Sequence, residues 1–178
     1  NYLGILHKLQ DYDKFKAVLD RIQKIKPTNF DEKAESFQNI AFYTLLYLMN
    51  TAKVEEAYDY IQSSGFKKDF KRYQSKINFA RRVTFWHNHM ILCFIMEDHK
   101  SSLQWLNTIL DNASSGSNAI RVDIYHFARI MELILQFEIE IRKPNQNFDE
   151  DFLKEKLRNA KRHLQRHDRG FEYYALIL

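Results

Sequence analysis

The chain has few of the residues that interrupt helices and almost none that form cross-links. Its 178 residues include four glycines, two prolines and one cysteine, Cys93. A single cysteine excludes a disulfide within the chain, and the low glycine and proline content argues against a fold rich in turns. The uninterrupted apolar run from Met90 to Met96 is far shorter than the roughly 20 residues that cross a bilayer. Because the sequence shows no secretory signal pattern either, we expect a cytoplasmic protein.

The residues that are abundant favour helices. Apolar residues make up 45% of the chain and charged residues 28%, proportions typical of a folded globular protein. Many leucine, isoleucine, lysine and glutamate residues with few helix breakers predict an all-α fold. The net charge is +4, and the basic residues gather in two stretches, 67–82 and 154–169. In the second stretch acidic residues come first and basic residues last, the order that a helix dipole favours.

Apolar residues recur at helical spacing through most of the chain, in pairs of segments separated by short turns. The pattern predicts one domain of helical hairpins over about residues 1–27, 29–65, 75–113 and 119–168, with a final helix over 171–178. The hairpin between Ala80 and Asn112 is the expected centre. Its first helix contains the run from Met90 to Met96, which is apolar on every side and should be covered all round. We expect the chain to be the C-terminal part of a longer protein.

Several positions predict helix ends. The tetrapeptide Asn-Phe-Asp-Glu occurs at residues 29–32 and again at 147–150, each time before a helical pattern, and we interpret both as capping boxes. Gly65 suits the left-handed residue that follows a helix. Residues 66–73 fit either a short helix or an irregular linker, and a long helix is predicted to begin near Ser75.

The turns of the first three hairpins are regularly spaced. They align at Gln10, Ala52 and Glu97, which gives spacings of 52 − 10 = 42 and 97 − 52 = 45 residues. Periods of this order are typical of helical solenoids. In such an array each hairpin buries its apolar faces against the next one.

In sequence, these turns resemble those of the tetratricopeptide repeat family. Pro27 stands where the closing proline of a repeat belongs, and Trp86 matches the tryptophan of its first helix. Ala57 and Ser102 match the small residue that ends the turn. All three turns lack the family's glycine, and the periods exceed the usual 34 or so residues, which leaves HEAT-like and other α–α solenoids open. More loosely, the chain resembles the C-terminal part of uncharacterised tetratricopeptide-like proteins from Bacteroidetes.

The resemblance implies a right-handed α–α superhelix in which the first helix of each hairpin lines a concave groove. It also implies a peptide or partner helix held in that groove by apolar anchors and a few polar groups. Carried over by the turn alignment, the groove positions are Asn39, Phe42, Leu46, Met49 and Asn50 in the second unit, and Thr84, His87, Ile91 and Phe94 in the third. Uncapped ends of such an array predict further repeats or self-association.

The sequence contains no catalytic or metal-binding pattern that we recognise. It has no glycine-rich phosphate loop, no nucleophile elbow, and no His-Glu-x-x-His or Cys-x-x-Cys motif. His163 and His167 share a helix face, but the neighbouring lysines and arginines repel a cation. Cys93 lies in an apolar run without a basic partner, which predicts an inert buried thiol. We therefore expect a protein that is not an enzyme and that carries no metal or cofactor.

The first basic stretch leaves two interpretations open. Phe66, Phe70 and Tyr73 alternate with cations, a mixture found in proteins that bind single-stranded nucleic acid. The i, i+4 spacing of Phe66 and Phe70 is also that of a stripe that packs on the next hairpin. The cations of this patch are Lys67, Lys68, Lys71, Arg72, Arg81 and Arg82.

The leading functional hypothesis is a non-catalytic scaffold that binds a peptide or partner helix in the groove of a helical solenoid. One alternative is a nucleic-acid-binding module that uses the basic stretches 67–82 and 154–169. Another is a peptide-sensing array that regulates an attached effector domain. Nucleic-acid binding by the basic stretches would weaken steeply as salt rises, which separates this alternative from the other two.

Overall fold

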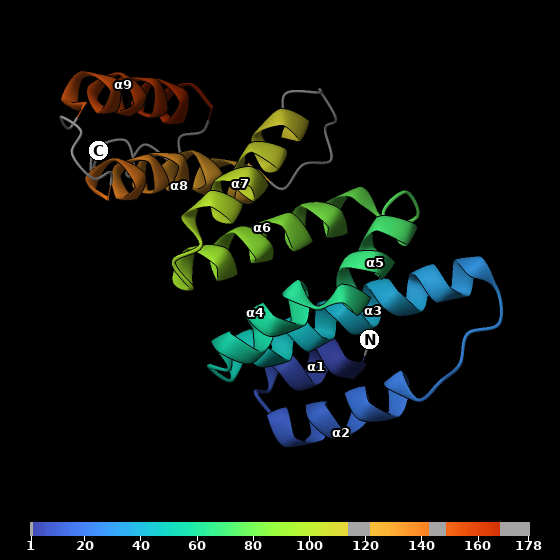
Figure 1. Cartoon of the computed structure of the whole chain (residues 1–178). Coiled ribbons are helices and arrows are strands. Elements are labelled where there is room, and N and C mark those ends of the chain that lie inside the picture. Colours follow the sequence, from blue (N-terminus) through green and yellow to red (C-terminus); the bar gives the residue numbers. More distant parts are fainter. Residues whose placement is uncertain (1, 114–121, 143–148, 168–178) are drawn as a thin grey trace.

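The computed structural model describes residues 2–113, 122–142 and 149–167, and every regular element in these ranges is an α-helix (Figure 1). The all-α prediction is therefore confirmed for the described residues. The predicted final helix over 171–178 lies outside them. The described helices are α1 (Tyr2–Lys8), α2 (Tyr12–Gln23), α3 (Phe30–Asn50), α4 (Val54–Gln62), α5 (Ser64–Tyr73), α6 (Phe79–Ile95), α7 (His99–Ala113), α8 (Val122–Ile141) and α9 (Glu150–His167).

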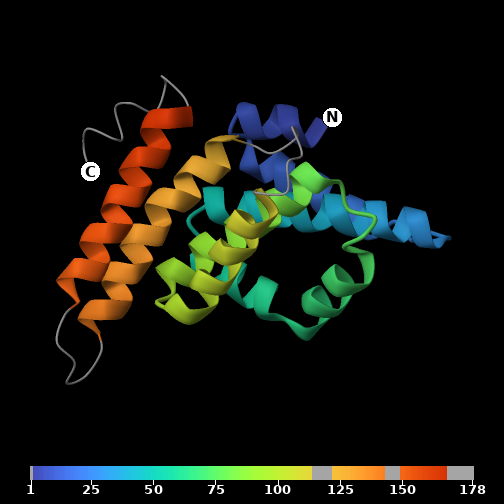
Figure 2. The same cartoon turned by 90° about the horizontal axis from the view of Figure 1, so that it is seen from above.

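Helices that follow one another in the chain form pairs. α1 packs on α2, α3 on α4, α6 on α7 and α8 on α9, and in Figure 1 these pairs succeed one another from the α1–α2 end to the α8–α9 end. Seen from above, α8 and α9 lie side by side (Figure 2). The first helices of neighbouring pairs also touch, because α6 contacts both α3 and α8. α6, the first helix of the hairpin that the sequence places at the centre, also contacts α4 and α7.

The same turn closes the first three hairpins. Gln10, Ala52 and Glu97 have left-handed backbones, with φ of 56°, 57° and 59°. In each turn the N–H of this residue donates to the carbonyl three residues before it, and the next N–H donates to the carbonyl five residues before itself. This pair of bonds is the Schellman motif, which ends a helix and reverses the chain. The turns fall at the three predicted positions, although none uses the glycine that this backbone favours.

The fifth residue after each turn is fully buried. Phe15, Ala57 and Ser102 occupy this position, and each is 0% exposed. The Ser102 hydroxyl of α7 donates to the Met90 carbonyl of α6 at 2.8 Å, so the two helices meet closely at this point. The repeat therefore extends from the turn into the contact between the paired helices.

Both tetrapeptides contain a residue that caps a helix. Asn29 caps α3, because its side chain accepts from the Glu32 N–H at 2.9 Å while the Glu32 carboxylate accepts from the Thr28 N–H at 2.8 Å. The second tetrapeptide acts in another register. There Asp149 caps α9 by accepting from the Phe152 N–H at 2.9 Å, and the predicted cap at residue 147 lies outside the described residues. Either side chain, asparagine or aspartate, has the oxygen that a cap needs.

The predicted left-handed glycine after the second hairpin is wrong. Gly65 lies inside α5, and α4 ends earlier, at Gln62. The hydroxyl of Ser63 accepts from the Phe66 N–H at 3.2 Å and so caps the new helix directly. Residues 66–73 are thus helical, which decides between the two options that the sequence left open.

The predicted bounds and burial of α6 need correction at both ends. The helix begins at Phe79 and not near Ser75, because Asn78 caps it by accepting from the Ala80 N–H at 2.9 Å. The apolar run near its other end is not covered all round, since Ile95 is 52% exposed. A run of apolar residues alone does not show how many neighbours a helix has.

Two clusters of buried side chains hold the helices together. The larger one extends from α3 to α8, and the smaller one joins α1, α2 and α3 around Phe15. Phe42 and Tyr47 of α3 pack against both clusters. α3 therefore ties the N-terminal pair to the rest of the fold.

Candidate binding surface

The predicted groove positions lie on α3 and α6, whose N-terminal halves are in direct contact. The Asn78 N–H, just before α6, donates to Gln38 Oε1 of α3 at 3.0 Å. Slightly farther along, the Arg81 guanidinium lies 3.6 Å from the centre of the Phe42 ring. Together with Thr84, these residues line a pocket of about 290 Å³, here called the α3–α6 pocket. The pocket is small and mixed in chemistry, with one ring, one cation and several amide or hydroxyl groups.

Arg81 is the charged group of this pocket. Burial lowers its pKa, but an arginine stays protonated in proteins. None of the carboxylates in the described ranges forms an ion pair with Arg81. The negative face of the Phe42 ring is therefore its closest electrostatic compensation.

α6 and α8 lie next to each other along the same side of the molecule. The rings of His87 and Phe127 are 5.3 Å apart. Farther along both helices, Arg142 lies 3.1 Å from the Glu97 carboxylate and 3.3 Å from that of Glu138. Since the two contacts occur in the same order on both helices, α6 and α8 run in the same direction.

A row of large apolar side chains is exposed between these contacts. Phe127, Ile134, Phe137 and Ile141 recur at the spacing of one helix face on α8, and they are between 38% and 50% exposed. Ile95, at the end of α6, is 52% exposed. We call these five residues the apolar stripe. Exposed apolar residues grouped on one helix face mark contact sites more often than scattered apolar residues do.

Sequence reasoning missed this stripe. The Phe127 ring, for example, is 38% exposed although it lies beside His87 of α6. The signal that was available is that α8 carries apolar residues on more of its circumference than one buried face needs. The same excess of apolar residues also occurs in helices that neighbours cover on every side. It therefore does not by itself indicate an exposed stripe. The residues that α8 does bury are Ile124, Ala128, Met131 and Leu135.

The predicted groove residues do not form one continuous pocket. Phe42 and Thr84 share the α3–α6 pocket, whereas Asn39 lines another depression, of about 280 Å³, with side chains of α1 and α2. The Asn50 amide turns back on its own helix and donates to the Leu46 carbonyl at 2.7 Å. His87 contacts α8, as described above. The remaining positions pack partly against the core: Leu46, Met49, Ile91 and Phe94.

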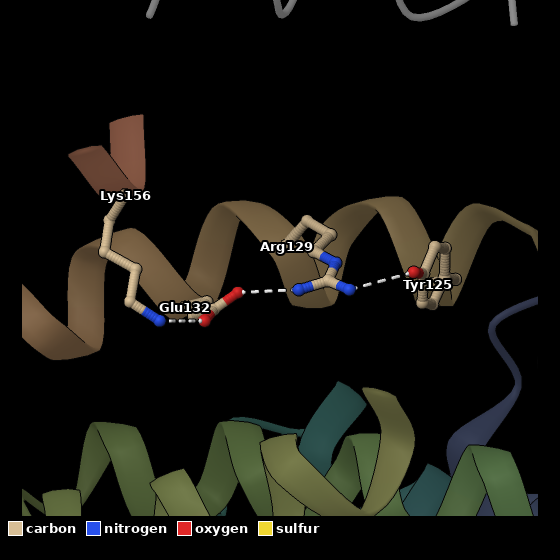
Figure 3. A network of polar contacts seen from close by, with 4 residues as sticks. All are labelled: Tyr125, Arg129, Glu132 and Lys156. Carbon is tan, nitrogen blue, oxygen red and sulfur yellow. Dashed lines mark hydrogen bonds and ion pairs between the residues drawn. The ribbon is translucent and has the colours of Figure 1, made fainter. Parts of the chain in front are cut away.

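α9 packs against α8 through a charged network (Figure 3). The Glu132 carboxylate accepts from Arg129 Nη1 at 3.0 Å and from Lys156 Nζ of α9 at 2.9 Å. Arg129 Nη2 also donates to the Tyr125 hydroxyl at 3.1 Å. Burial raises the pKa of Glu132, but the two cations outweigh burial and the net shift is downward. This network fixes α9 on α8.

His89 is a packing residue. Its ring lies 5.3 Å from that of Phe66, 6.0 Å from that of Phe70 and 4.7 Å from that of Trp105. Its Nδ1 donates to the Phe85 carbonyl at 2.6 Å, which fixes the neutral tautomer. Burial lowers the pKa of His89 to about 4. The imidazole is therefore neutral near pH 7 and has no free access to a substrate.

Cys93 is a further reactive side chain in the described part of the chain. Burial raises the pKa of the Cys93 thiol to about 11, which keeps it protonated near pH 7. Within the described ranges, no three histidine, cysteine or acidic side chains gather as ligands of a metal ion would. None of the helices described there combines the length and the apolar character of a bilayer span. The side chains of His163 and His167 lie outside the described residues.

The predicted basic patch is divided between two helices. Phe66, Phe70 and Tyr73 are buried on the inner side of α5, as the packing interpretation predicted. Arg81 belongs to the α3–α6 pocket, and the guanidinium of Arg82 lies over rings of its own helix. The exposed cations of the patch are those of α5: Lys67, Lys68, Lys71 and Arg72.

Comparison of the chain with protein-family models, with curated proteins and with solved structures finds no match. The resemblance to tetratricopeptide repeats therefore stays a prediction that rests on the turn residues. What the protein does has to be argued from the geometry of its surfaces.

Proposed function

We propose that the chain is a non-catalytic scaffold that binds a partner helix along the exposed side of α3, α6 and α8. The observation that carries the proposal is the apolar stripe, in which five large apolar side chains on two parallel helices are between 38% and 52% exposed. Each square ångström of apolar surface that a partner covers contributes about 25 cal/mol. A row of partly exposed apolar side chains is thus a source of binding energy.

The proposal includes a right-handed superhelix of the tetratricopeptide type. Three turns of the same geometry, the packing of successive helices and the contacts of α6 with α3 and α8 support it. In an array of this kind the first helices of the pairs form one continuous surface. The α3–α6 pocket and the apolar stripe would then be two parts of a single groove.

An amphipathic helix fits this surface best. Its apolar residues at i, i+3 or i+4, and i+7 would lie on the apolar stripe, as in other helix-in-groove complexes. Arg81 at one end and the Glu97–Arg142 pair at the other end place charges beyond the apolar residues. Such charges set the direction of a bound helix more than its affinity.

Site-specific photo-crosslinking tests the proposal. A photoreactive amino acid in place of Ile134 should trap a partner in the cell, whereas the same replacement of Leu9 should not. Leu9 is the matched control because it is also apolar and exposed, but lies in the α1–α2 pair. The trapped segment is then made as a peptide and titrated into the purified chain by calorimetry. We expect an amphipathic helix whose affinity falls about tenfold or more with Ile134→Asp, as for a central contact residue.

Two outcomes contradict the proposal. One is equal crosslinking from positions 134 and 9. The other is an affinity that Ile134→Asp leaves unchanged while circular dichroism shows the variant to be folded. If the trapped protein is a second copy of the chain, with a mass above one chain by light scattering, self-association replaces the partner helix.

A further inference from the structure

Helix α5 lies between the α3–α4 and α6–α7 pairs in the chain. The chemistry of its exposed side differs from that of the apolar stripe. Lys67 and Lys71 are one turn apart on it, and so are Lys68 and Arg72, which gives two adjacent rows of cations. Asp69 is the acid of this helix, so its net charge is 4 − 1 = +3 over ten residues. The buried rings of α5 hold both rows in place.

The four cations of α5 form no ion pair with any carboxylate of the described residues. Lysines elsewhere in those ranges do pair: Lys16 lies 2.6 Å from Asp20, and Lys76 lies 2.9 Å from Asp31. Like charges one helical turn apart repel one another. A polyanion that covers both rows would remove this repulsion and release bound counterions.

An exposed ring lies beside these cations. Phe30, the first residue of α3, is 42% exposed, and its ring centre is 5.3 Å from that of Tyr73. The Arg72 guanidinium is 5.8 Å from the centre of the Phe30 ring and 5.4 Å from that of Tyr73. An aromatic ring flanked by a guanidinium is a surface on which a nucleobase stacks well.

Tyr73 also lines a pocket of about 500 Å³, whose other lining residues come from the end of α2, the segment after it, α3, α4 and α5. This volume lies within the range of about 300–1,000 Å³ that small-ligand sites occupy. Its wall contains both rings and hydrogen-bonding groups, which suits the face and the edge of a base. The wall includes Lys33, Ser36, Phe37, Tyr60 and Asp69.

We propose that the exposed side of α5, Phe30 and the adjoining pocket form a site for single-stranded nucleic acid. The phosphates contact the two rows of cations, one base stacks on Phe30, and a neighbouring base enters the pocket. A single strand fits because its bases are free to leave the stack, whereas a duplex keeps them paired. An acidic protein would use the cations but not the ring and the pocket. The site does not depend on the apolar stripe or on the function proposed for it.

Fluorescence anisotropy with labelled oligothymidylate and oligouridylate tests the proposal. Four phosphate contacts on a single strand give a salt slope of about −0.7 × 4 = −2.8, or an affinity about 50-fold weaker at 200 mM than at 50 mM salt. Replacing the four cations of α5 by glutamine should abolish most of the affinity and flatten the slope. The matched control removes four cations from α9, through Lys154→Gln, Arg158→Gln, Lys161→Gln and Arg162→Gln. We expect that variant to keep the affinity and the slope of the unchanged chain.

Phe30→Ala separates base stacking from charge. The loss of one stacked base should weaken binding by at least about fivefold. The salt slope should stay the same, because the ring carries no charge. Polyglutamate serves as a polyanion without bases and should compete poorly for the site.

Several results would overturn the proposal, provided that circular dichroism shows each variant to be folded. They are an absence of oligonucleotide binding at low salt, and an equal loss of affinity in the α5 and α9 variants. Polyglutamate that binds as tightly as the oligonucleotides would assign the patch to an acidic protein instead. An affinity that Phe30→Ala leaves unchanged would mean that no base stacks on Phe30. The observations would then no longer favour nucleic acid over another polyanion.

Discussion

α5 and α8 have similar buried faces and opposite exposed faces. α5 turns Phe66, Phe70 and Tyr73 inward, and α8 turns an apolar face of its own inward. Outward, α5 carries two rows of cations and α8 carries four of the five residues of the apolar stripe. The inner faces place both helices in the fold by the same means, the burial of apolar surface. The outer faces contribute little to that placement, so their chemistry can differ without changing the fold.

The largest expected effect is on stability, when a ring is removed from the inner face of α5 and not from the outer face of α8. Phe66 is buried against the rings of Phe37, Phe70 and Phe85, so Phe66→Ala should lower the free energy of unfolding by about 3–5 kcal/mol. Phe137→Ala removes the same ring from the exposed stripe and should cost less than about 1 kcal/mol. Urea denaturation of both variants checks this. Similar losses in the two variants would mean that buried rings do not hold α5.

The next effect concerns His89, which the rings of α5 help to enclose. Its pKa is about 4 in the folded chain and about 6.5 in an unfolded one. Below pH 6.5 the unfolded state therefore binds more protons, and the free energy of unfolding falls as the pH falls. The loss grows until about pH 4, where it amounts to about 3 kcal/mol. No change is expected from this group above pH 7, where both states are neutral.

Urea denaturation at a series of pH values measures the His89 effect. The control is His89→Phe, which stays neutral at every pH and keeps an aromatic ring among its neighbours. This variant should show a shallower loss of stability between pH 6.5 and pH 4 than the unchanged chain. Parallel curves for the two proteins would mean that the imidazole is protonated as easily in the folded chain as in the unfolded one.

A smaller effect is expected where α9 joins α8. Glu132→Gln keeps the shape of the side chain but removes the charge that pairs with Arg129 and Lys156. Because the Glu132 side chain is only 17% exposed, the loss should be about 1–3 kcal/mol. Glu150→Gln, which breaks the exposed pair with Lys154, is the control and should cost less than about 0.5 kcal/mol. Equal effects on the urea midpoint would show that the network is no stronger than a surface ion pair.

The features that sequence predicted well are those that a few neighbouring residues determine. The turns at Gln10, Ala52 and Glu97 follow from short connections between helical stretches, and the Asn29 cap follows from one side chain and the next three residues. The spacing of the α5 rings favoured a packed face, and this face is buried. Each of these depends on hydrogen bonds or periodicity within one or two turns of helix.

The features that sequence missed depend on which helices become neighbours. How far Phe127 is exposed depends on how α8 meets α6, α7 and α9, and its ring lies 5.3 Å from that of His87 of α6. Gly65 gave no sign that Ser63 would cap a further helix. Of the groove positions, Phe42 and Thr84 meet in one pocket while Asn39 faces α1 and α2, a division that a turn alignment does not contain. Local sequence patterns do not determine which side chains of different helices meet.

The smallest expected effects are those of neutral replacements on the two outer faces. Lys68→Gln on α5 and Ile134→Gln on α8 should each change the free energy of unfolding by no more than about 0.5 kcal/mol, since neither side chain fills a buried space. Urea midpoints and slopes measured side by side check this. A large loss from Ile134→Gln would show that the stripe stabilises the fold, and its exposed apolar area would then no longer argue for a partner. A gain from Lys68→Gln would instead measure the repulsion among the α5 cations that a bound polyanion would relieve.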